Sequence, residues 1–217
     1  MPPSPKPTKK EVVTAFRTRE ILAAARQLME QRGLEAVTME EIAAAAGVAK
    51  GTIYLYFPSK DELIQAIITQ VGEGLLQDIE AAVTAPGSPG EKIQRVAALL
   101  LECLTKERAL YPIYARDSHR LGQGSPQGYW RQLQEREYKF FELVTPVFSQ
   151  GIAAGQFIPA NPRLLTFMLR GMIRGMGYYQ MVEAREGAVK EALPVFLTLL
   201  FSGLTPKIPA AEEVAPL

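Results

Sequence analysis

Residues 38–63 read TMEEIAAAAGVAKGTIYLYFPSKDEL, and this stretch decides the fold. Thr38 and Glu41 have the spacing of a T-x-x-E capping box, in which a hydroxyl and a carboxylate satisfy backbone amides at a helix N-terminus. The spacing predicts a short helix over residues 39–46. Gly47 should end this helix, because glycine adopts the positive φ of a tight turn without strain.

A second short helix is expected after this turn, over about residues 49–55. Pro58 follows, and Ser59 with Glu62 repeats the capping box at the start of a much longer helix. The apolar stripe of that helix runs until the sequence PGSPG at 86–90 stops it. Two short helices around a glycine turn are the core of a helix-turn-helix, a common DNA-binding arrangement.

The same stretch meets the packing demands of a helix-turn-helix. Ala43 is small enough to let the two short helices approach each other, and Ile42, Val48 and Ile53 can hold both against a preceding helix over about 10–31. An alanine-rich helical hairpin could also serve core packing alone, and no single residue decides between the two interpretations. Their combination favours DNA binding.

The front of the second short helix carries small and hydrogen-bonding groups suited to a DNA groove. Gly51 costs about 1 kcal/mol relative to alanine inside a helix, which a close approach of DNA would explain. Lys50 can meet a phosphate or a guanine edge, and a helix N-terminus at Thr38 can bind phosphate. The residues predicted to contact DNA are Thr38, Ala49, Lys50, Gly51, Thr52, Tyr54, Tyr56 and Lys60.

This stretch, with REILAAARQLMEQRGLEAVT at 19–38 before it, resembles the DNA-binding signature of the TetR family of bacterial transcriptional repressors. The resemblance covers residues 18–67, about a quarter of the chain, and is highly specific. Ala49 departs from it, because the family often has a serine there, so one phosphate contact is lost.

The resemblance implies a homodimer that binds a palindromic operator and releases it when a small molecule fills a pocket in a helical body. Dimeric helix-turn-helix proteins place their recognition helices about one DNA turn apart, ~34–36 Å, or multiples of it. The ligand would tilt the long helix that starts at Ser59, and its effect would be a shift between two populations. The identity of the effector does not carry over, because the bodies vary widely within the family.

Outside this stretch the whole pattern remains helical, so the chain is expected to be an all-α protein of about nine helices. We expect a flexible basic arm over 1–10, a DNA-binding domain over 11–60, an effector-binding and dimerisation domain over 61–204 and a loose tail over 205–217. Lys and Arg number 24 and Asp and Glu 23, so overall charge indicates no partner. The first 60 residues are basic, with nine Lys and Arg against six Asp and Glu.

Cys103 is the one cysteine and His119 the one histidine, which excludes an internal disulfide and zinc sites built from several such residues. No catalytic residues, metal or cofactor are predicted, and the chain is not expected to be an enzyme. It has no signal-peptide pattern and no run of roughly 20 apolar residues that could span a membrane. We expect a cytoplasmic protein without a membrane partner.

The last two predicted helices, over about 162–186 and 188–202, are candidates for a dimer interface. Gly171 and Gly175 lie four apart on one face, where small residues let a second helix approach closely. The final helix is apolar on more than one side and must be buried on several. By resemblance the interface would include Gly171, Gly175, Phe196 and Leu200, although ordinary core packing is the alternative.

Aromatic and polar residues gather in the middle of the chain, a mixture that suits a small, lipophilic effector. The predicted effector-binding residues are Tyr111, Tyr114, Arg116, His119, Trp130, Phe141, Arg174 and Tyr178. Each aromatic could instead belong to the core. Arg174 could bind an acidic group of the ligand or pair with Glu183 or another acid.

Two rival functions remain open. The chain could be a DNA-binding regulator controlled by a protein partner, which predicts a collapsed pocket and an exposed apolar patch. It could also be a helical binding protein or enzyme with a vestigial helix-turn-helix, which would show no salt-dependent DNA affinity.

Overall fold

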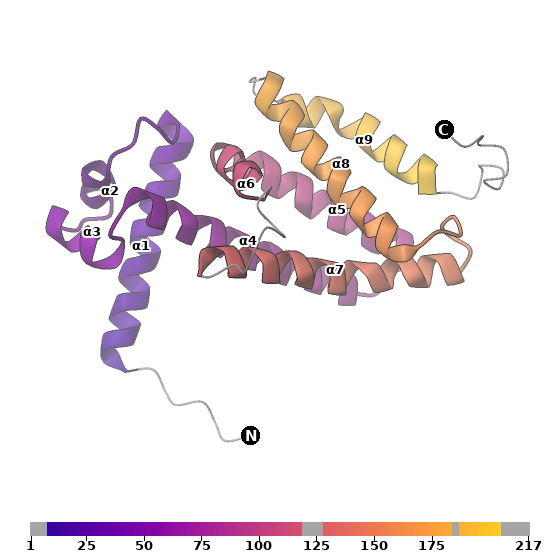
Figure 1. The fold of residues 1–217 in the computed structure, drawn as a ribbon, viewed down its shortest axis with the longest axis horizontal. Helices are drawn as coiled ribbons and strands as arrows, with labels where there is room; N and C mark the ends of the chain where they lie inside the picture. The colour runs from indigo at the N-terminus through magenta and orange to yellow at the C-terminus, as the bar shows by residue number, and fades with distance from the viewer. Residues whose placement is uncertain (1–7, 119–127, 184–186, 205–217) are drawn as a thin grey trace. The chain divides into compact units, whose positions relative to one another are not determined.

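The computed structural model describes residues 8–118, 128–183 and 187–204, and over these residues it contains helices and no strands (Figure 1). The all-α prediction is confirmed. The helices, in chain order, are α1 (Lys9–Arg32), α2 (Met39–Ala45), α3 (Lys50–Tyr56), α4 (Lys60–Thr84), α5 (Pro89–Lys106), the 3-10 helix η1 (Arg108–Leu110), α6 (Tyr111–Ser118), α7 (Tyr129–Ala153), α8 (Pro162–Glu183) and α9 (Ala188–Leu204).

The chain forms two compact units. The first runs through Val71 and includes Glu107–Leu110, and the second comprises Gly72–Lys106 and the chain from Tyr111 onward. Our sequence-based boundary after residue 60 coincides with the start of α4, whereas the first unit also takes in the first turns of this helix. The first seven residues of the predicted arm, His119 and the predicted tail lie outside the described residues.

The first unit is built on α1. Thr8 caps this helix, with its side chain accepting a hydrogen bond from the Glu11 amide while the Glu11 carboxylate accepts one from Thr8. The capping box therefore starts α1 just before the predicted residue 10. At the other end Gly33, at φ +80°, donates its amide to the Met29 carbonyl and ends the helix.

Apolar residues from four helices close the core of the first unit. Ile42 and Ala43 of α2 and Ile53 of α3 are buried as the sequence predicted, whereas Val48 in the turn is half-buried. The other buried residues of this core are Ile21, Leu22, Ala25, Met29, Val37, Met39, Phe57, Leu63, Ile64, Ile67 and Ile68. The last four belong to α4, so burial explains why the unit extends past residue 60.

The second unit is a helical bundle in which α7 contacts α5 and α8, and α8 contacts α9. Its apolar core includes Ile93, Val96, Leu100, Phe140, Val144, Phe148, Leu169 and Ile173. Phe196 and Leu200 of α9 belong to it as well, with 3% and 5% of their surface exposed. Of the four residues that we assigned to a dimer interface, the two on α9 are therefore core residues of the protomer.

None of the described helices is long and apolar enough to cross a membrane.

Candidate nucleic-acid interface and buried polar cluster

A glycine turn sets the geometry of α2 and α3. Gly47 has φ +64°, and the Val48 amide donates a 2.9 Å hydrogen bond to the Ala43 carbonyl. Ala49 then caps α3 with extended backbone and without a side-chain hydrogen bond. The helix-turn-helix arrangement expected from the sequence is thus present, with the N-terminus of α3 at the turn.

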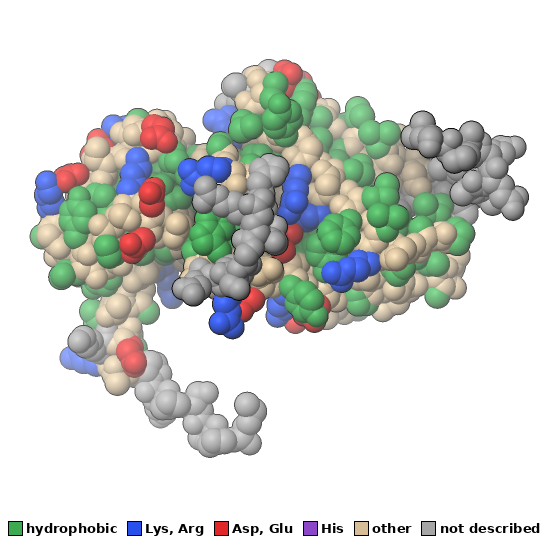
Figure 2. All heavy atoms as spheres, viewed as in Figure 1, with side chains coloured by type: hydrophobic (Ala, Val, Ile, Leu, Met, Phe, Trp, Pro, Cys, Tyr) green, Lys and Arg blue, Asp and Glu red, His purple; other side chains and the backbone are tan. Residues whose placement is uncertain are grey.

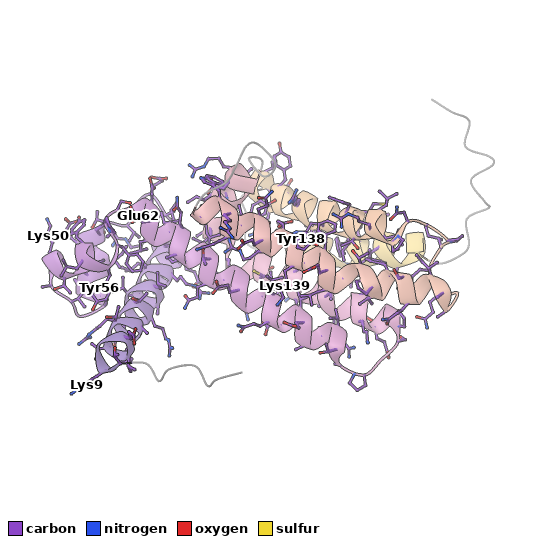
Figure 3. The ribbon with its side chains drawn as sticks, turned by 60° about the horizontal axis from the view of Figure 1, so that its bottom comes forward. Lys9, Lys50, Tyr56, Glu62, Tyr138 and Lys139 are labelled. Carbon is purple, nitrogen blue, oxygen red and sulfur yellow. The ribbon has the colours of Figure 1, made fainter. Side chains whose placement is uncertain are left out.

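Four of the eight residues predicted to contact DNA are exposed on α3 or directly before it. Ala49, Lys50, Gly51 and Tyr54 are exposed, while the predicted contacts Thr52, Tyr56 and Lys60 are half-buried. Figure 3 labels Lys50 and Tyr56, which lie at opposite ends of this short helix.

Gly51 has no structural explanation within the first unit. A Cβ atom at this position would have no side-chain or neighbouring atom within 4 Å, and its backbone is helical rather than in the glycine-specific region. Alanine would therefore fit and would favour the helix by about 1 kcal/mol. The bare backbone at Gly51 suits the close approach of another molecule.

An acid that the sequence analysis did not consider lies on the same surface. The Lys50 Nζ atom is 2.7 Å from Glu40 Oε1, and both side chains are largely exposed. The hydrogen bond from Lys50 lowers the pKa of Glu40, and the same bond raises the pKa of Lys50. Tyr54 also hydrogen-bonds to Glu40 and lowers the pKa of its carboxyl. Glu40 therefore faces two of the predicted DNA-contacting residues.

Thr38 has less freedom to bind phosphate than the sequence suggested. Its hydroxyl accepts a hydrogen bond from the Glu41 amide, and its own amide donates a 2.9 Å bond to Glu41 Oε2. Arg32 donates a 2.7 Å bond to the other carboxylate oxygen of Glu41. The Thr38 amide, followed by the Arg32 and Thr38 side chains, lowers the pKa of Glu41 to about 2. A phosphate contact by Thr38 must replace one of these bonds.

The second unit contains a buried polar cluster centred on Glu137 of α7. The Tyr114 hydroxyl donates a 2.7 Å hydrogen bond to Glu137 Oε1, Arg170 of α8 pairs with the same carboxylate, and Arg174 Nη2 lies 3.4 Å from Oε2. Burial alone raises the pKa of Glu137, but the charge and hydrogen bond of Arg170 outweigh it and lower the pKa. Burial raises the pKa of Tyr114 to about 12, so its hydroxyl stays protonated.

Arg136 and Tyr129, two further polar residues of α7, are half-buried. The Nη1 and Nη2 atoms of Arg136 are buried and have no hydrogen-bond partner among the described residues, whereas the Tyr129 hydroxyl interacts with Asp117. Burial, followed by the charge of Asp117, raises the pKa of Tyr129. Asp117 is 2% exposed and accepts a 3.0 Å hydrogen bond from Arg116 Nε.

The structure brings three predicted effector-binding residues together: Tyr114 and Arg174 contact Glu137, and the Tyr111 hydroxyl donates a 2.8 Å hydrogen bond to the Arg174 carbonyl. Trp130 lies edge-on to Tyr129, with ring centroids 5.3 Å apart. The acid that pairs with Arg174 is Glu137 rather than Glu183.

Other predicted effector-binding residues lie elsewhere. Phe141 is buried and its ring lies 4.3 Å from that of Phe167, in the apolar part of the bundle. Arg116 is exposed beside Asp117, and Tyr178 is 63% exposed. His119 lies outside the described residues.

Sequence reasoning missed Glu137, Arg170, Arg136 and Asp117. One signal could have revealed Glu137, because it continues the buried stripe of Leu133, Phe140, Phe141 and Val144 on the same face of α7. A charged residue at such a position must be paired when buried. No group of three or more potential metal ligands occurs among the described residues.

A row of exposed apolar side chains follows one face of α8, and α9, which packs on α8, exposes two more. Figure 2 shows hydrophobic side chains at the surface over α8, among basic ones. A Cβ atom at Gly171 or Gly175 would meet no atom within 4 Å, so both glycines are open on this face. The exposed apolar residues are Leu164, Phe167, Met168, Tyr178, Met181 and Val182 of α8 and Val195 and Leu199 of α9. We call these residues and the two glycines the α8–α9 face.

Comparison with known families identifies the first unit. The profile described as "Bacterial regulatory proteins, tetR family" matches residues 21–67. The HTH-type transcriptional repressor KstR2 of Mycobacterium tuberculosis is 26% identical over 189 residues, which are 86% of this chain and 92% of the relative. The regulator BetI of Brucella anthropi is 37% identical over 84 residues, which are 39% of this chain and 43% of BetI.

Solved structures show the same fold over most of the chain. A transcriptional regulator of the TetR/AcrR family from Thermobifida fusca has a TM-score of 0.72 at 24% identity and covers 87% of this chain and 98% of its own. FadR of Bacillus subtilis, solved in complex with stearoyl-CoA, has a TM-score of 0.64 at 21% identity, over 86% and 98% of the two chains. The relatives and neighbours named here are transcriptional regulators.

Proposed function

We propose that the chain is a transcriptional regulator of the TetR family rather than an enzyme, and that it acts as a homodimeric repressor. The match of residues 21–67 to the tetR-family profile, the similarity to KstR2 and the shared fold support this proposal. The repressor binds a palindromic DNA operator through α3, and a small lipophilic effector in the second unit releases it. The observation that carries the proposal is the exposed side of α3, where Lys50 and Tyr54 flank the open backbone of Gly51. As a regulator of bacterial DNA, it acts in the cytoplasm.

The α8–α9 face supports the dimer. A monomeric soluble protein rarely exposes a continuous apolar patch of this kind, and such patches mark interaction sites. A second copy would cover the same face symmetrically, with the open backbone at Gly171 and Gly175 allowing close approach of the two α8 helices. On α9, the residues that contribute to this interface are the exposed Val195 and Leu199, and not the buried Phe196 and Leu200 that the sequence suggested.

Names of related proteins support a lipophilic effector. KstR2 is described as a ketosteroid transcriptional regulator, and FadR was solved with stearoyl-CoA. Both names point to ligands with a large apolar part. In this chain α4 crosses without interruption from the first compact unit to the second. A ligand that prefers one position of α4 would therefore shift the population of DNA-binding dimers.

The test is binding of Lys50→Ala and Tyr54→Phe variants to a fluorescent duplex from upstream of the protein's own gene. Each change should weaken operator binding, by about 1–3 kcal/mol where the side chain reads a base edge, and leave dimer mass and unfolding midpoint unchanged. Unchanged operator affinity in both variants would exclude α3 as the helix that recognises the operator sequence. Release by a purified protein but by no small molecule would favour the alternative of a protein partner.

A further inference from the structure

Arg136 occupies an unusual position in the second unit. Its guanidinium group lies against the backbone of α4 at Gly72, where a Cβ atom would be 2.9 Å from Arg136 Nε and 3.0 Å from Cδ. Any residue other than glycine at position 72 would displace this side chain. Gly74, one residue further along, has no atom within 4 Å of its Cβ position, so only one of the two glycines makes room for the arginine.

The charge of Arg136 is not satisfied by the residues around it. Both of its terminal nitrogens are buried and have no hydrogen-bond partner within the described part of the chain. The acids whose charges act on it are Glu73, which is exposed, and Glu137, whose oxygens already accept from Tyr114, Arg170 and Arg174. The Glu137 carboxylate thus already pairs with two other guanidinium groups, those of Arg170 and Arg174.

An unpaired buried cation is costly to the folded state, and buried polar groups are nearly always hydrogen-bonded. Burial lowers the pKa of Arg136, and the charges of Glu73 and Glu137 only partly oppose this effect. An arginine held in this way is suited to an incoming oxyanion, because its planar group can donate two parallel hydrogen bonds to a carboxylate or phosphate.

We infer that Arg136 receives a carboxylate or phosphate group of a ligand that is otherwise apolar. This inference rests on the proposed function and defines its effector as an acid. Gly72 is also the first residue of the second compact unit, within α4. An anion that draws the guanidinium group away from Gly72 changes the packing of α4 at this point, which gives the ligand a direct effect on the helix that continues to the DNA-binding unit.

The first experiment measures stability without any ligand. Arg136→Met keeps much of the side-chain volume and removes the buried charge, so the full-length variant should unfold at the same or a higher urea concentration than the wild type. Arg131→Met is the control, since Arg131 is on the same helix, 71% exposed and paired with Glu135. A clear loss of stability in Arg136→Met alone would show that the arginine has a structural partner, and would overturn the inference.

The second experiment measures binding of decanoate, decyl phosphate and decanol by calorimetry. At least one of the two acids should bind the wild type ten times or more tightly than decanol. Which of the two acids binds more tightly shows whether the site prefers a carboxylate or a phosphate. Arg136→Met should abolish this preference and Arg131→Met should retain it. Gly72→Ala should weaken acid binding, while Gly74→Ala, which adds the same methyl group to the same helix, should not.

Equal binding of acids and decanol, an acid preference that survives in Arg136→Met, or no binding of either acid would each contradict the inference. Operator binding by the same preparations separates this failure from failure of the proposed function. If the wild type binds its operator but shows no preference for acids, only the inference about Arg136 is contradicted. If the wild type binds no operator, the proposed function is contradicted, and its preference for acids still tests the role of Arg136.

Discussion

At the level of single residues, we expect Glu40 to limit how much of the charge of Lys50 is available to DNA. Lys50 Nζ and Glu40 Oε1 are 2.7 Å apart on an exposed surface, where water and salt screen the ion pair. DNA phosphates must compete with Glu40 for the lysine. An acid on a DNA-facing surface also repels the phosphate backbone of DNA. This repulsion should reduce binding to incorrect sequences more than binding to the operator.

Glu40→Gln should therefore strengthen binding to random-sequence DNA several-fold and steepen its dependence on salt, since one more lysine becomes available to phosphate. The measurement is fluorescence anisotropy of a non-operator duplex across a salt series. Glu30→Gln is the control, because it removes the same charge from α1 of the same unit. Equal effects of the two changes would show that only the net charge of the unit matters, and would contradict a specific role of Glu40.

Glu41 provides a pH-dependent test of the α2 cap. Its pKa of about 2 lies below the ordinary 4.5, so its ionised form stabilises the fold above pH 4.5, and this contribution is lost as the pH falls towards 2. Carboxyl NMR titration should give a pKa near 2 in the wild type and a higher value in Arg32→Gln, which lacks the guanidinium bond to Glu41. Arg17→Gln, which breaks only the pair with Glu20, should leave it unchanged. A wild-type pKa near 4.5 would show that the capping box does not form.

At the level of helices, Gly177 allows α6 and α8 to approach each other. A Cβ atom at Gly177 would lie 2.1 Å from Cζ of the Tyr111 ring, whose hydroxyl donates to the Arg174 carbonyl in the preceding turn of α8. Tyr111 thus packs directly on the backbone of α8. This close contact places α6, and with it Tyr114, beside the buried cluster.

Gly177→Ala should destabilise the protein by about 1–3 kcal/mol, because the added methyl group overpacks this contact and displaces Tyr111. Gly74→Ala should instead be neutral or stabilising by up to about 1 kcal/mol, since that helical position is open. Urea unfolding of both variants measures the difference. Equal midpoints would show that Tyr111 does not rest on α8 in solution.

The helices were predictable because their boundaries depend on local chemistry. The capping box at Thr38 and the turn at Gly47 lie where the sequence placed them, since each depends on residues only a few positions apart. The buried cluster was only partly predictable, because the pairing of Glu137 with Arg170 depends on how α7 packs on α8. The sequence marked α9 as apolar on several sides but could not distinguish Phe196, which faces the core, from Val195, which faces outward.

At the level of the whole molecule, the α8–α9 face should hold two copies together. Tyr178 and Tyr138 are similarly exposed, at 63% and 61%, but Tyr178 lies on this face, whereas Tyr138 lies on α7 (Figure 3). Tyr178→Glu should therefore give a monomer in analytical ultracentrifugation and lose operator binding, because each half of a palindrome needs its own α3. Tyr138→Glu should remain a dimer. A wild-type monomer, or a Tyr178→Glu dimer, would exclude this face as the interface.

The most direct test of the account is selection of genomic DNA fragments by the purified protein, followed by affinity measurements on the selected fragments across a salt series. The account predicts strong enrichment of a few fragments that share a palindrome, with an affinity that falls steeply as salt rises and is lost in Lys50→Ala. Weak and equal binding to all fragments, unchanged in Lys50→Ala, would contradict a repressor that reads its operator through α3.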